Sequence, residues 1–575
     1  MTRHPAASAL SPRAREETLQ RLARTQYDLL VIGGGVTGAG VALDAAVRGL
    51  SVALVEMRDY AAGTSSRSGK LFHGGLRYLE QFDFSLVREA LKERALMLER
   101  LCPHLVKPIQ FVYPLRHRVW ERAYIGAGLL LYDTLGGAGA VPRHRHLSRG
   151  AVGRLAPGIA QDELVGALTF YDAQVDDSRH TMELARTAAA HGADVASAVK
   201  VVGLALDAGR VAGATVCDLE SGGRFDIRAH HVVNATGVWT DSVNRMTGRP
   251  ASFSVQASKG VHIMVPREKI DSQVSMFVRA EDSVLFVRSW GRHWLIGTTD
   301  TAWNQSLDHP AATSADIEYL LHNLNRVLKV KLTRDDIDGV FVGLRPLVRG
   351  NAATTSKLSR EHAVESPLPG FTTITGGKYT TYRVMAKDAV DLAVKGLERA
   401  VKPCSTEHVP LIGAVGLDDT RRSFGAKAAA RGLSAEHVQH LLGRYGSLVD
   451  DLDALMAQRP ELAEPIKGAE DYLAVEAVYA ATHEGALHLD DVLTRRTHIS
   501  IETPDHGLTA APMVAALVAP ALGWDETRMA EEVRRYHARL EAELSAQQLF
   551  DDAAAMAVRD AVRDPRLVIA DQEVP

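Results

Sequence analysis

Near the start of the chain, short apolar runs alternate with a segment in which apolar residues recur at helical spacing. Residues 28–32 form one apolar run, a glycine-rich turn follows, and small apolar residues recur at helical spacing from Ala39. A second run, 51–55, ends at Glu56. Runs of this length around a helix are typical of buried parallel strands. The pattern predicts a β-α-β unit, and a later run from His231, which breaks at small residues, predicts another central strand of the same sheet.

The turn after the first strand has the glycine spacing of a dinucleotide site. Gly33 allows the tight turn, Gly35 lets the backbone approach a pyrophosphate, and Gly38 lets helix and strand pack closely. The helix N-terminus adds free N–H groups and a partial positive charge. Glu56 follows Gly38 at the distance expected of a residue that binds a ribose hydroxyl. The alternative is an ordinary glycine-rich turn with a surface glutamate, and the combined spacing favours dinucleotide binding.

The pattern changes twice further along the chain. Between residues 252 and 331, polar and apolar residues alternate, which predicts antiparallel strands that cover a substrate. From about 420 to 546, Ala, Leu, Glu and Arg recur at helical spacing, which predicts a separate helical domain. The predicted fold class is α/β, with an antiparallel or mixed substrate sheet and an α-helical C-terminal domain.

These changes also predict domain boundaries. The predicted parts are a flexible N-terminal extension at 1–25, an oxidoreductase unit at 26–401, a linker at 402–417, an α-helical domain at 418–560 and a tail at 561–575. Within the unit, cofactor-binding parts are predicted at about 26–105, 155–250 and 340–401, and substrate-binding parts at about 106–154 and 251–339.

Composition excludes several classes of protein. The 575 residues carry 66 Lys and Arg against 70 Asp and Glu, so no basic excess points to nucleic acid. The three cysteines, Cys102, Cys217 and Cys404, are far apart, which argues against a disulfide framework and fits a reducing compartment. No apolar run is long enough for a transmembrane helix. The histidine pairs 144/146 and 230/231 lack partner ligands, so no metal site is predicted.

Glycine turns recur at points that are distant in the sequence. They lie at 33–38, 74–75, 235–237, 343 and 376–377. A single nucleotide-binding strand needs only the first, so the set suggests a large cofactor along the carboxyl ends of the strands and favours FAD over NAD. Individually, some of these glycines are expected to be ordinary loop residues.

Basic residues and histidines accompany these turns. Fixed cations suit a phosphorylated substrate, and each one alone could instead be a solvated surface charge. The cations are Lys70, Arg77, Arg345, Arg360 and Lys378. Lys70 could serve the flavin pyrophosphate, and Lys378 the reduced flavin ring. His73 or His262 could accept an alcohol proton, although a lone histidine is more often a core residue.

One segment combines basic, aromatic and apolar residues. Residues 111–132 place Arg116, Arg118, Trp120 and Tyr124 before an apolar run. Such a stretch can lie in a lipid headgroup layer without crossing it. A core helix with an exposed start is an equal alternative.

Together these motifs resemble the FAD-dependent sn-glycerol-3-phosphate dehydrogenases. The resemblance covers about residues 26–545, including Glu484 and the run 491–496 in the helical domain, and its most specific block is 70–78. The motifs are Ile32-Gly-Gly-Gly-Val-Thr-Gly-Ala-Gly, Thr64-Ser-Ser, Ser68-Gly-Lys-Leu-Phe-His-Gly-Gly-Leu-Arg-Tyr-Leu-Glu80, Asn234-Ala-Thr-Gly-Val-Trp, Lys259-Gly-Val-His, Gly297-Thr-Thr-Asp, Gly343-Leu-Arg-Pro-Leu and Gly376-Gly-Lys-Tyr-Thr-Thr-Tyr. No calcium-binding EF-hand loop is found, so the chain resembles the bacterial, aerobic and membrane-associated type.

The resemblance implies a glutathione-reductase-like (Rossmann) FAD domain, a mixed-sheet substrate domain and a helical cap. It implies oxidation of sn-glycerol 3-phosphate to dihydroxyacetone phosphate, by hydride transfer from C2 to flavin N5, with electrons passed to a membrane quinone. It also implies a cytoplasmic protein attached peripherally to the inner face of the membrane. The sequence permits a homodimer, and leaves both dimerisation and a lid as roles for the helical domain.

Motifs and resemblance together predict the site residues. Predicted catalytic residues are His73, His262 and Arg345, and a relayed water is the alternative base. Predicted substrate contacts are Arg77, Tyr78, Arg345, Arg360 and Lys378; the residues flanking Arg360 differ from the family pattern. Predicted cofactor-binding residues are Gly33, Gly35, Val36, Thr37, Gly38, Glu56, Met57, Thr64, Ser65, Ser68, Lys70, Leu71, His73, Gly74, Ala235, Thr236, Gly237, Trp239, Gly343, Gly377, Lys378, Tyr379 and Thr380.

Three other functions remain open at this point. The first is an oxidase that passes electrons from the same substrate to O2. The second is an amino-acid or amine oxidase of the same fold, which would need a carboxylate-binding arginine but fewer cations. The third is a non-catalytic or RNA-associated flavoprotein, which the charge balance disfavours.

Overall fold

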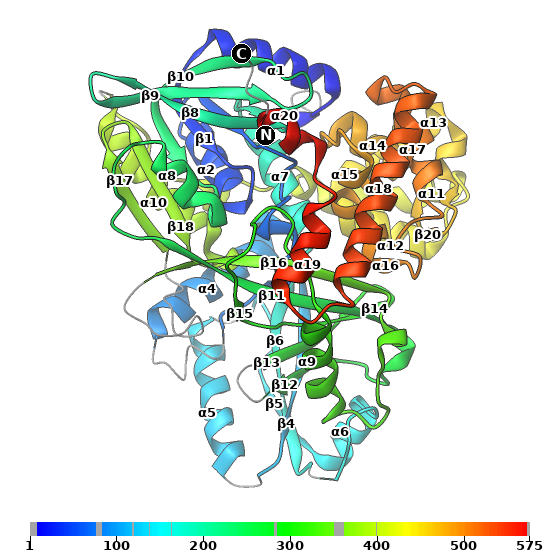
Figure 1. The fold of residues 1–575 in the computed structure, drawn as a ribbon. Coiled ribbons are helices and arrows are strands. Elements are labelled where there is room, and N and C mark those ends of the chain that lie inside the picture. The colour runs from blue at the N-terminus through cyan, green and yellow to red at the C-terminus, as the bar shows by residue number, and fades with distance from the viewer. Residues whose placement is uncertain are drawn as a thin grey trace.

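A computed structural model describes residues 8–75, 83–117, 120–136, 139–162, 164–280, 284–349, 362–397 and 399–571. Two large sheets and a helical C-terminal part make up the molecule (Figure 1). Among the described residues, none of the helices combines the length and apolar character needed to cross a bilayer.

The first sheet has eight strands in the order β17-β18-β10-β1-β2-β7, extended by β9 and β8. Its strands are β1 (Gln26–Ile32), β2 (Val52–Val55), β7 (Asp194–Ala196), β8 (Val199–Asp207), β9 (Arg210–Asp218), β10 (Arg224–Asn234), β17 (His362–Leu368) and β18 (Phe371–Gly376). Strands β18, β10, β1, β2 and β7 run parallel, as the apolar runs predict. This confirms the predicted α/β fold class.

Three helices pack on the parallel strands around one apolar core. They are α2 (Val36–Val47), α7 (Asp177–Ala190) and α10 (Tyr382–Ala393). The short helix α8 (Thr240–Arg245) follows β10. Because these strands run parallel, their carboxyl ends gather at one edge of the sheet.

The N-terminal residues form a helix, so the predicted flexible extension is wrong for residues 12–24. Helix α1 (Pro12–Arg24) packs Leu22 in the core beneath β7–β10. Arg15 donates to the Ser197 carbonyl at 3.0 Å and forms an ion pair with Asp218. The arginines that suggest a solvated segment therefore have partners far away in the sequence.

The second sheet has ten strands in the order β15-β11-β14-β13-β12-β4-β6-β3, with β16 beside β11 and β5 beside β6. Its strands are β3 (Leu71–Phe72), β4 (Lys107–Leu115), β5 (Arg145–Ser148), β6 (Gly166–Gln174), β11 (Val255–Pro266), β12 (Ser275–Arg279), β13 (Val284–Trp290), β14 (His293–Gly297), β15 (Thr301–Ala302) and β16 (Gly339–Val348). Strands β6 and β16 fall in segments predicted to bind the cofactor, yet they belong to this sheet. The chain therefore passes between the two sheets more often than the pattern of apolar and polar residues predicts.

Helices surround the second sheet. Helices α6 (Arg149–Leu155) and α9 (Ser314–Asn325) share its core on one face. Helix α4 (Phe84–Leu96) leads into a π-helical turn, Met97–Leu101, and helix α5 (Trp120–Leu135) extends along the other side (Figure 1).

The C-terminal part is helical, with two apolar cores and a small hairpin of β19 (Pro465–Ile466) and β20 (Ala469–Leu473). Its helices are α11 (Leu417–Ala430), α12 (Ala435–Tyr445), α13 (Val449–Gln458), α14 (Ala474–His483), α15 (Leu489–Asp491), α16 (Ile499–Glu502), α17 (Ala511–Leu522), α18 (Glu526–Ala546), α19 (Asp552–Asp560) and α20 (Pro565–Asp571). Helix α20 lies in the predicted tail, where Arg566 forms ion pairs with Asp491 and Asp564.

His488 links the C-terminal helices to the first sheet. Its Nε2 lies 2.9 Å from Glu220 after β9, and its Nδ1 lies 3.0 Å from Glu532 of α18. Burial and Arg566 lower the pKa of His488, but hydrogen bonds to the two carboxylates outweigh them and raise it to about 9.

We expect the stabilisation by His488 to depend on pH. Because its folded pKa is raised, the stabilisation is full below the unfolded pKa of about 6.5 and is lost as pH rises to about 9. His488→Gln should lower the melting temperature strongly at pH 6 and little at pH 9.5. Thermal unfolding across this range measures it, with exposed His408→Gln as control. A deficit that is the same at both pH values would contradict the prediction.

Candidate functional site

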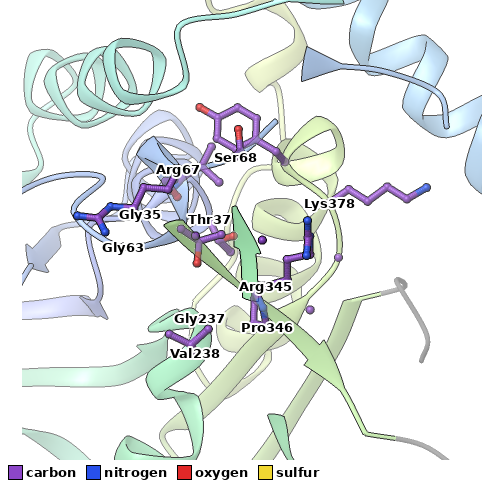
Figure 2. A pocket seen from close by; sticks show the side chains of 18 of the residues that line it. Gly35, Thr37, Gly63, Arg67, Ser68, Gly237, Val238, Arg345, Pro346 and Lys378 are labelled. Atoms are coloured by element: carbon purple, nitrogen blue, oxygen red, sulfur yellow. The ribbon is translucent and has the colours of Figure 1, made fainter. Parts of the chain in front are cut away.

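A cavity of about 480 Å³ lies between the two sheets. Gly35 and Thr37 reach it from the start of α2, whereas Arg345 and Lys378 reach it from β16 and from the turn after β18 (Figure 2). Gly237, after β10, also lines it. The cavity therefore lies at the carboxyl ends of the parallel strands, where α/β sheets bind their ligands.

The glycine turn forms one end of this cavity. Gly33 has a φ of 108°, which favours glycine, and a Cβ there would lie 2.7 Å from the Ala235 carbonyl oxygen. Gly35 is the N-cap of α2 and lines the cavity. The Val36 N–H donates to Ser65 Oγ at 2.9 Å, which fixes the loop 62–70 against the helix N-terminus. This geometry is a cradle for a pyrophosphate.

Glu56 lies where the second strand ends. Its carboxylate accepts hydrogen bonds from the Gly34 N–H at 2.7 Å and the Arg58 N–H at 2.9 Å. Burial raises its pKa, and these two N–H groups act against that rise. The backbone thus holds the carboxylate at the edge of the cavity, in the position predicted for a ribose partner.

Most predicted cofactor residues line this cavity. They are Gly33, Gly35, Val36, Thr37, Glu56, Met57, Thr64, Ser65, Ser68, Leu71, His73, Ala235, Thr236, Gly237, Trp239, Gly343, Gly377, Lys378, Tyr379 and Thr380. Segments as far apart in the sequence as Gly33 and Thr380 thus meet around one space.

Three predicted cofactor residues do not line it. A Cβ on Gly38 would lie 1.8 Å from the Gly33 carbonyl oxygen, so this glycine serves packing of helix on strand. A Cβ on Gly74 would lie 2.7 Å from Leu91, so it also serves packing. Lys70 is buried, and its ammonium forms an ion pair with Asp177 at the start of α7 and donates to the Ser66 carbonyl at 3.0 Å. The structure gives Lys70 a positioning role, because its charge holds the loop rather than facing the cavity.

The other end of the cavity holds the predicted catalytic residues. His262 lies on β11, stacked 4.8 Å from Phe341 and almost fully buried, and its Nδ1 has no hydrogen-bond partner. Burial first, then the cations Arg288, Arg345 and Lys70, keep its pKa well below the usual range. His262 is therefore neutral at pH 7 and can accept a proton.

Arg345 lies on β16, opposite Ser258 of strand β11, the strand that also carries His262. Its Nη2 donates to Thr298 Oγ1 at 3.0 Å and to the Thr299 carbonyl at 3.1 Å. Its Nη1 lies 3.4 Å from Asp300 Oδ1. These contacts fix the orientation of the guanidinium fork, which suits an oxygen that gains negative charge.

His73 and Lys378 complete the set that the structure brings together. The His73 N–H donates to Thr380 Oγ1 at 3.1 Å, so the chain after β3 is fastened to the turn after Lys378. Three predicted substrate contacts, Arg77, Tyr78 and Arg360, lie outside the described residues.

Arg288 on β13 is a cavity residue that sequence reasoning missed. It is buried, its Nη1 donates to the Lys70 carbonyl at 2.8 Å, and its Nη2 has no hydrogen-bond partner. Burial lowers its pKa to about 9. The available signal was a cation inside an apolar strand, Val284-Leu-Phe-Val-Arg288.

We expect Arg288→Met to raise the pKa of His262. Arg288 is the first cation, after burial, that lowers this pKa, and methionine keeps the apolar bulk without the charge. The acid limb of the pH profile of kcat/KM should move to higher pH, and histidine NMR should report the same shift. Exposed Arg279→Met on neighbouring β12 is the control. An unmoved acid limb together with an unmoved histidine titration would contradict the prediction.

The residues fit an elongated dinucleotide cofactor. The cradle at Gly35 and the carboxylate of Glu56 line this space. Strand β16 approaches the loop closely at Gly343, where a Cβ would lie 2.4 Å from the Arg67 carbonyl oxygen. His262 also lines this space, and its Nδ1 has no hydrogen-bond partner among the described residues. Such a fold and cavity define a FAD-dependent oxidoreductase.

Comparison with known proteins agrees. The family model "FAD dependent oxidoreductase" matches residues 28–383, and "C-terminal domain of alpha-glycerophosphate oxidase" matches residues 404–529. The chain is 54% identical to "Glycerol-3-phosphate dehydrogenase 2" of Mycobacterium tuberculosis, over 98% of this chain and 96% of that protein. It is 36% identical to the mitochondrial glycerol-3-phosphate dehydrogenase of Homo sapiens, over 91% of this chain and 74% of that protein.

A solved structure gives the same result. The glycerol-3-phosphate dehydrogenase from Bacillus halodurans complexed with FAD has a TM-score of 0.77 and 29% identity, covering 93% of this chain and 98% of that chain. The chain belongs to the glycerol-3-phosphate dehydrogenase family. The predicted family, fold class and cofactor are confirmed.

Proposed function

We propose that the protein oxidises sn-glycerol 3-phosphate to dihydroxyacetone phosphate. The observation that carries this proposal is that the neutral His262 and the fixed fork of Arg345 line the same cofactor cavity. The names of the relatives support the substrate. Lys378 is the described cation for its phosphate, with Arg77 and Arg360 proposed as further contacts.

The chemistry breaks the C2–H and O–H bonds of the alcohol and forms a carbonyl. FAD, held by the glycine cradle and Glu56, would supply the acceptor for the hydride that leaves C2. Cations that hold the phosphate orient C2 and replace an entropic barrier by binding energy. Arg345 stabilises the negative charge that develops on the substrate oxygen. His73, His262 or a relayed water accepts the hydroxyl proton, and the low pKa of His262 keeps its imidazole unprotonated at neutral pH.

One spectrum tests this proposal. Anaerobic addition of sn-glycerol 3-phosphate should bleach the flavin absorbance of the holoenzyme, whereas glycerol and an amino acid should not. Bleaching by the amino acid alone, or a flavin that ignores the phosphate ester, would overturn the proposal. Re-oxidation by a quinone analogue against O2 then separates the dehydrogenase from an oxidase.

We also propose a membrane quinone as the acceptor, with α5 as the contact to the cytoplasmic face of the membrane. Ile125, Leu129 and Tyr132 are buried under α5. The opposite face exposes Trp120, Tyr124, Leu130 and Leu131. This spacing is that of an amphipathic helix, whose exposed face carries an apolar stripe.

The surroundings of the stripe favour an anionic lipid surface. Basic residues gather at the start of α5, where Arg122 donates to the Leu147 carbonyl at 3.1 Å and His117 stacks on Trp120 at 5.4 Å. Arg116 and Arg145 are exposed nearby. Aromatic residues beside cations are typical of helices that lie in an anionic headgroup layer.

Vesicle binding tests the membrane contact. Wild-type protein should sediment with vesicles that contain anionic lipid, and the double variant Trp120→Ser with Leu130→Ser should lose most of this binding. Phe550→Ser, at another exposed apolar residue, should bind like the wild type. Equal sedimentation of all three proteins would remove α5 from the proposal.

A further inference from the structure

A second cavity lies between the oxidoreductase unit and the C-terminal helices. Its volume is about 60 Å³, whereas roughly 10–15 Å³ of such space is enough for one water. It is lined by the loop after η2 (Thr64–Ser66), by β16, and by α16, α18 and α19. The space can hold several waters or one small anion.

Three guanidinium groups and one carboxylate line this interdomain cavity. Glu543 already binds Arg539 at 2.6 Å and Arg559 at 3.1 Å. Arg539 also lies 2.9 Å from Asp490 behind the cavity wall. Arg67 donates to the Val342 carbonyl at 3.3 Å and has no ion-pair partner among the residues that the structure describes. Arg67, which is half-buried, is therefore the cation of this cavity without a carboxylate in ion-pair contact among the described residues.

Three residues that line the same space carry polar atoms without partners among the described residues. Ser66 and Ser500 are each 8% exposed and Arg559 is 3% exposed. Ser66 Oγ, Ser500 Oγ and Arg559 Nε have no hydrogen-bond partner in the described part of the chain. A buried polar group without a hydrogen bond is unfavourable, so three such groups around one cavity indicate a ligand or ordered water.

The charge around Arg67 favours an anion over water alone. Burial lowers the pKa of Arg67 to about 10; Glu543 opposes this, and the cations Arg58, Arg495 and Arg539 add to it. Burial also lowers the pKa of Arg559. A negative charge placed between these two groups would relieve both effects.

We propose that the interdomain cavity binds a small tetrahedral oxyanion, inorganic phosphate or sulfate, between Arg67 and Arg559, with Ser66 and Ser500 as hydroxyl donors. Arginine forks match such an anion well. Arg67 lines both cavities, and its side chain leaves the loop that also carries Ser68 (Figure 2). The anion would therefore fasten the cofactor loop to α19.

Anomalous scattering tests the site directly. Crystals of the holoenzyme, grown without phosphate or sulfate, would be soaked in selenate, a tetrahedral oxyanion with a strong anomalous signal. We expect a selenium peak within hydrogen-bond distance of Arg67 and Arg559. A cavity that holds water only, with selenate elsewhere or absent, would overturn the proposal. The proposed substrate does not enter this test.

Phosphate titration tests it in solution. Phosphate should raise the melting temperature of the holoenzyme. Ser500→Val removes a donor and fills space, so it should raise the phosphate concentration that gives half of this effect at least tenfold. Arg67→Met should do the same, and Arg13→Met, at a 88% exposed side chain, should not. Arg67 also lines the cofactor cavity. If Arg67→Met loses FAD for that reason, the result for Ser500→Val decides the test. An unchanged phosphate dependence in Ser500→Val would contradict the proposal.

Discussion

Replacing Arg345 by alanine is expected to lower kcat about 10²–10³-fold while FAD stays bound, a loss typical of removing one donor to a developing oxyanion. The guanidinium of Arg345 is held by Thr298 and Thr299, so it is already oriented in the absence of substrate. Alanine removes this donor without touching the pyrophosphate cradle at the other end of the cavity. Steady-state kinetics and the ratio of flavin absorbance to protein absorbance measure the two effects separately.

Two further variants sharpen the Arg345 result. Arg345→Lys keeps a positive charge but not the planar fork, so it should recover only part of the activity. Arg279→Ala removes an exposed arginine from the same sheet and should act like the wild type. Wild-type turnover in Arg345→Ala would exclude Arg345 from the chemistry.

The cofactor half of the site could be predicted because its signals are local. Gly33, Gly35 and Glu56 lie within one β-α-β unit, where the spacing of residues along the chain fixes their separation in space. The motifs at Gly343 and Gly377 are distant in sequence, but each follows or ends an apolar strand run. Gly377 follows β18, so strand direction places it at the carboxyl edge of the first sheet, whereas Gly343 lies within β16 of the second sheet.

The charged interior could not be predicted in the same way. Lys70 looks like a phosphate ligand in the sequence, and only the fold brings Asp177 to its ammonium. In the sequence, Arg288 looks like the outward residue of an alternating strand. In the structure its side chain is buried. Burial of a cation depends on what packs above the strand, and periodicity along one strand carries no such information.

The first twenty-four residues show the same limit. Their arginines outnumber their acids, which is typical of a solvated segment. Arg15 and Arg21 bind Asp218 and Asp194, which lie on strands much further along the sequence. Local charge balance therefore does not reveal that two arginines of this helix have partners far away in the sequence.

The second large effect is expected for Gly35→Val, which should abolish FAD binding and activity while the protein still folds. A Cβ at Gly35 meets only Ser65 Oγ, at 3.1 Å, so the chain itself tolerates a side chain there. The same side chain projects into the cavity where the pyrophosphate is expected to contact the N-terminus of α2. Gly203→Val is the matched control, since a Cβ on this strand residue meets nothing within 4 Å. The flavin spectrum of the purified variant, with circular dichroism for the fold, measures both parts. A yellow, active Gly35→Val protein would show that the cofactor does not approach this turn, and the assignment of the cradle would fall with it.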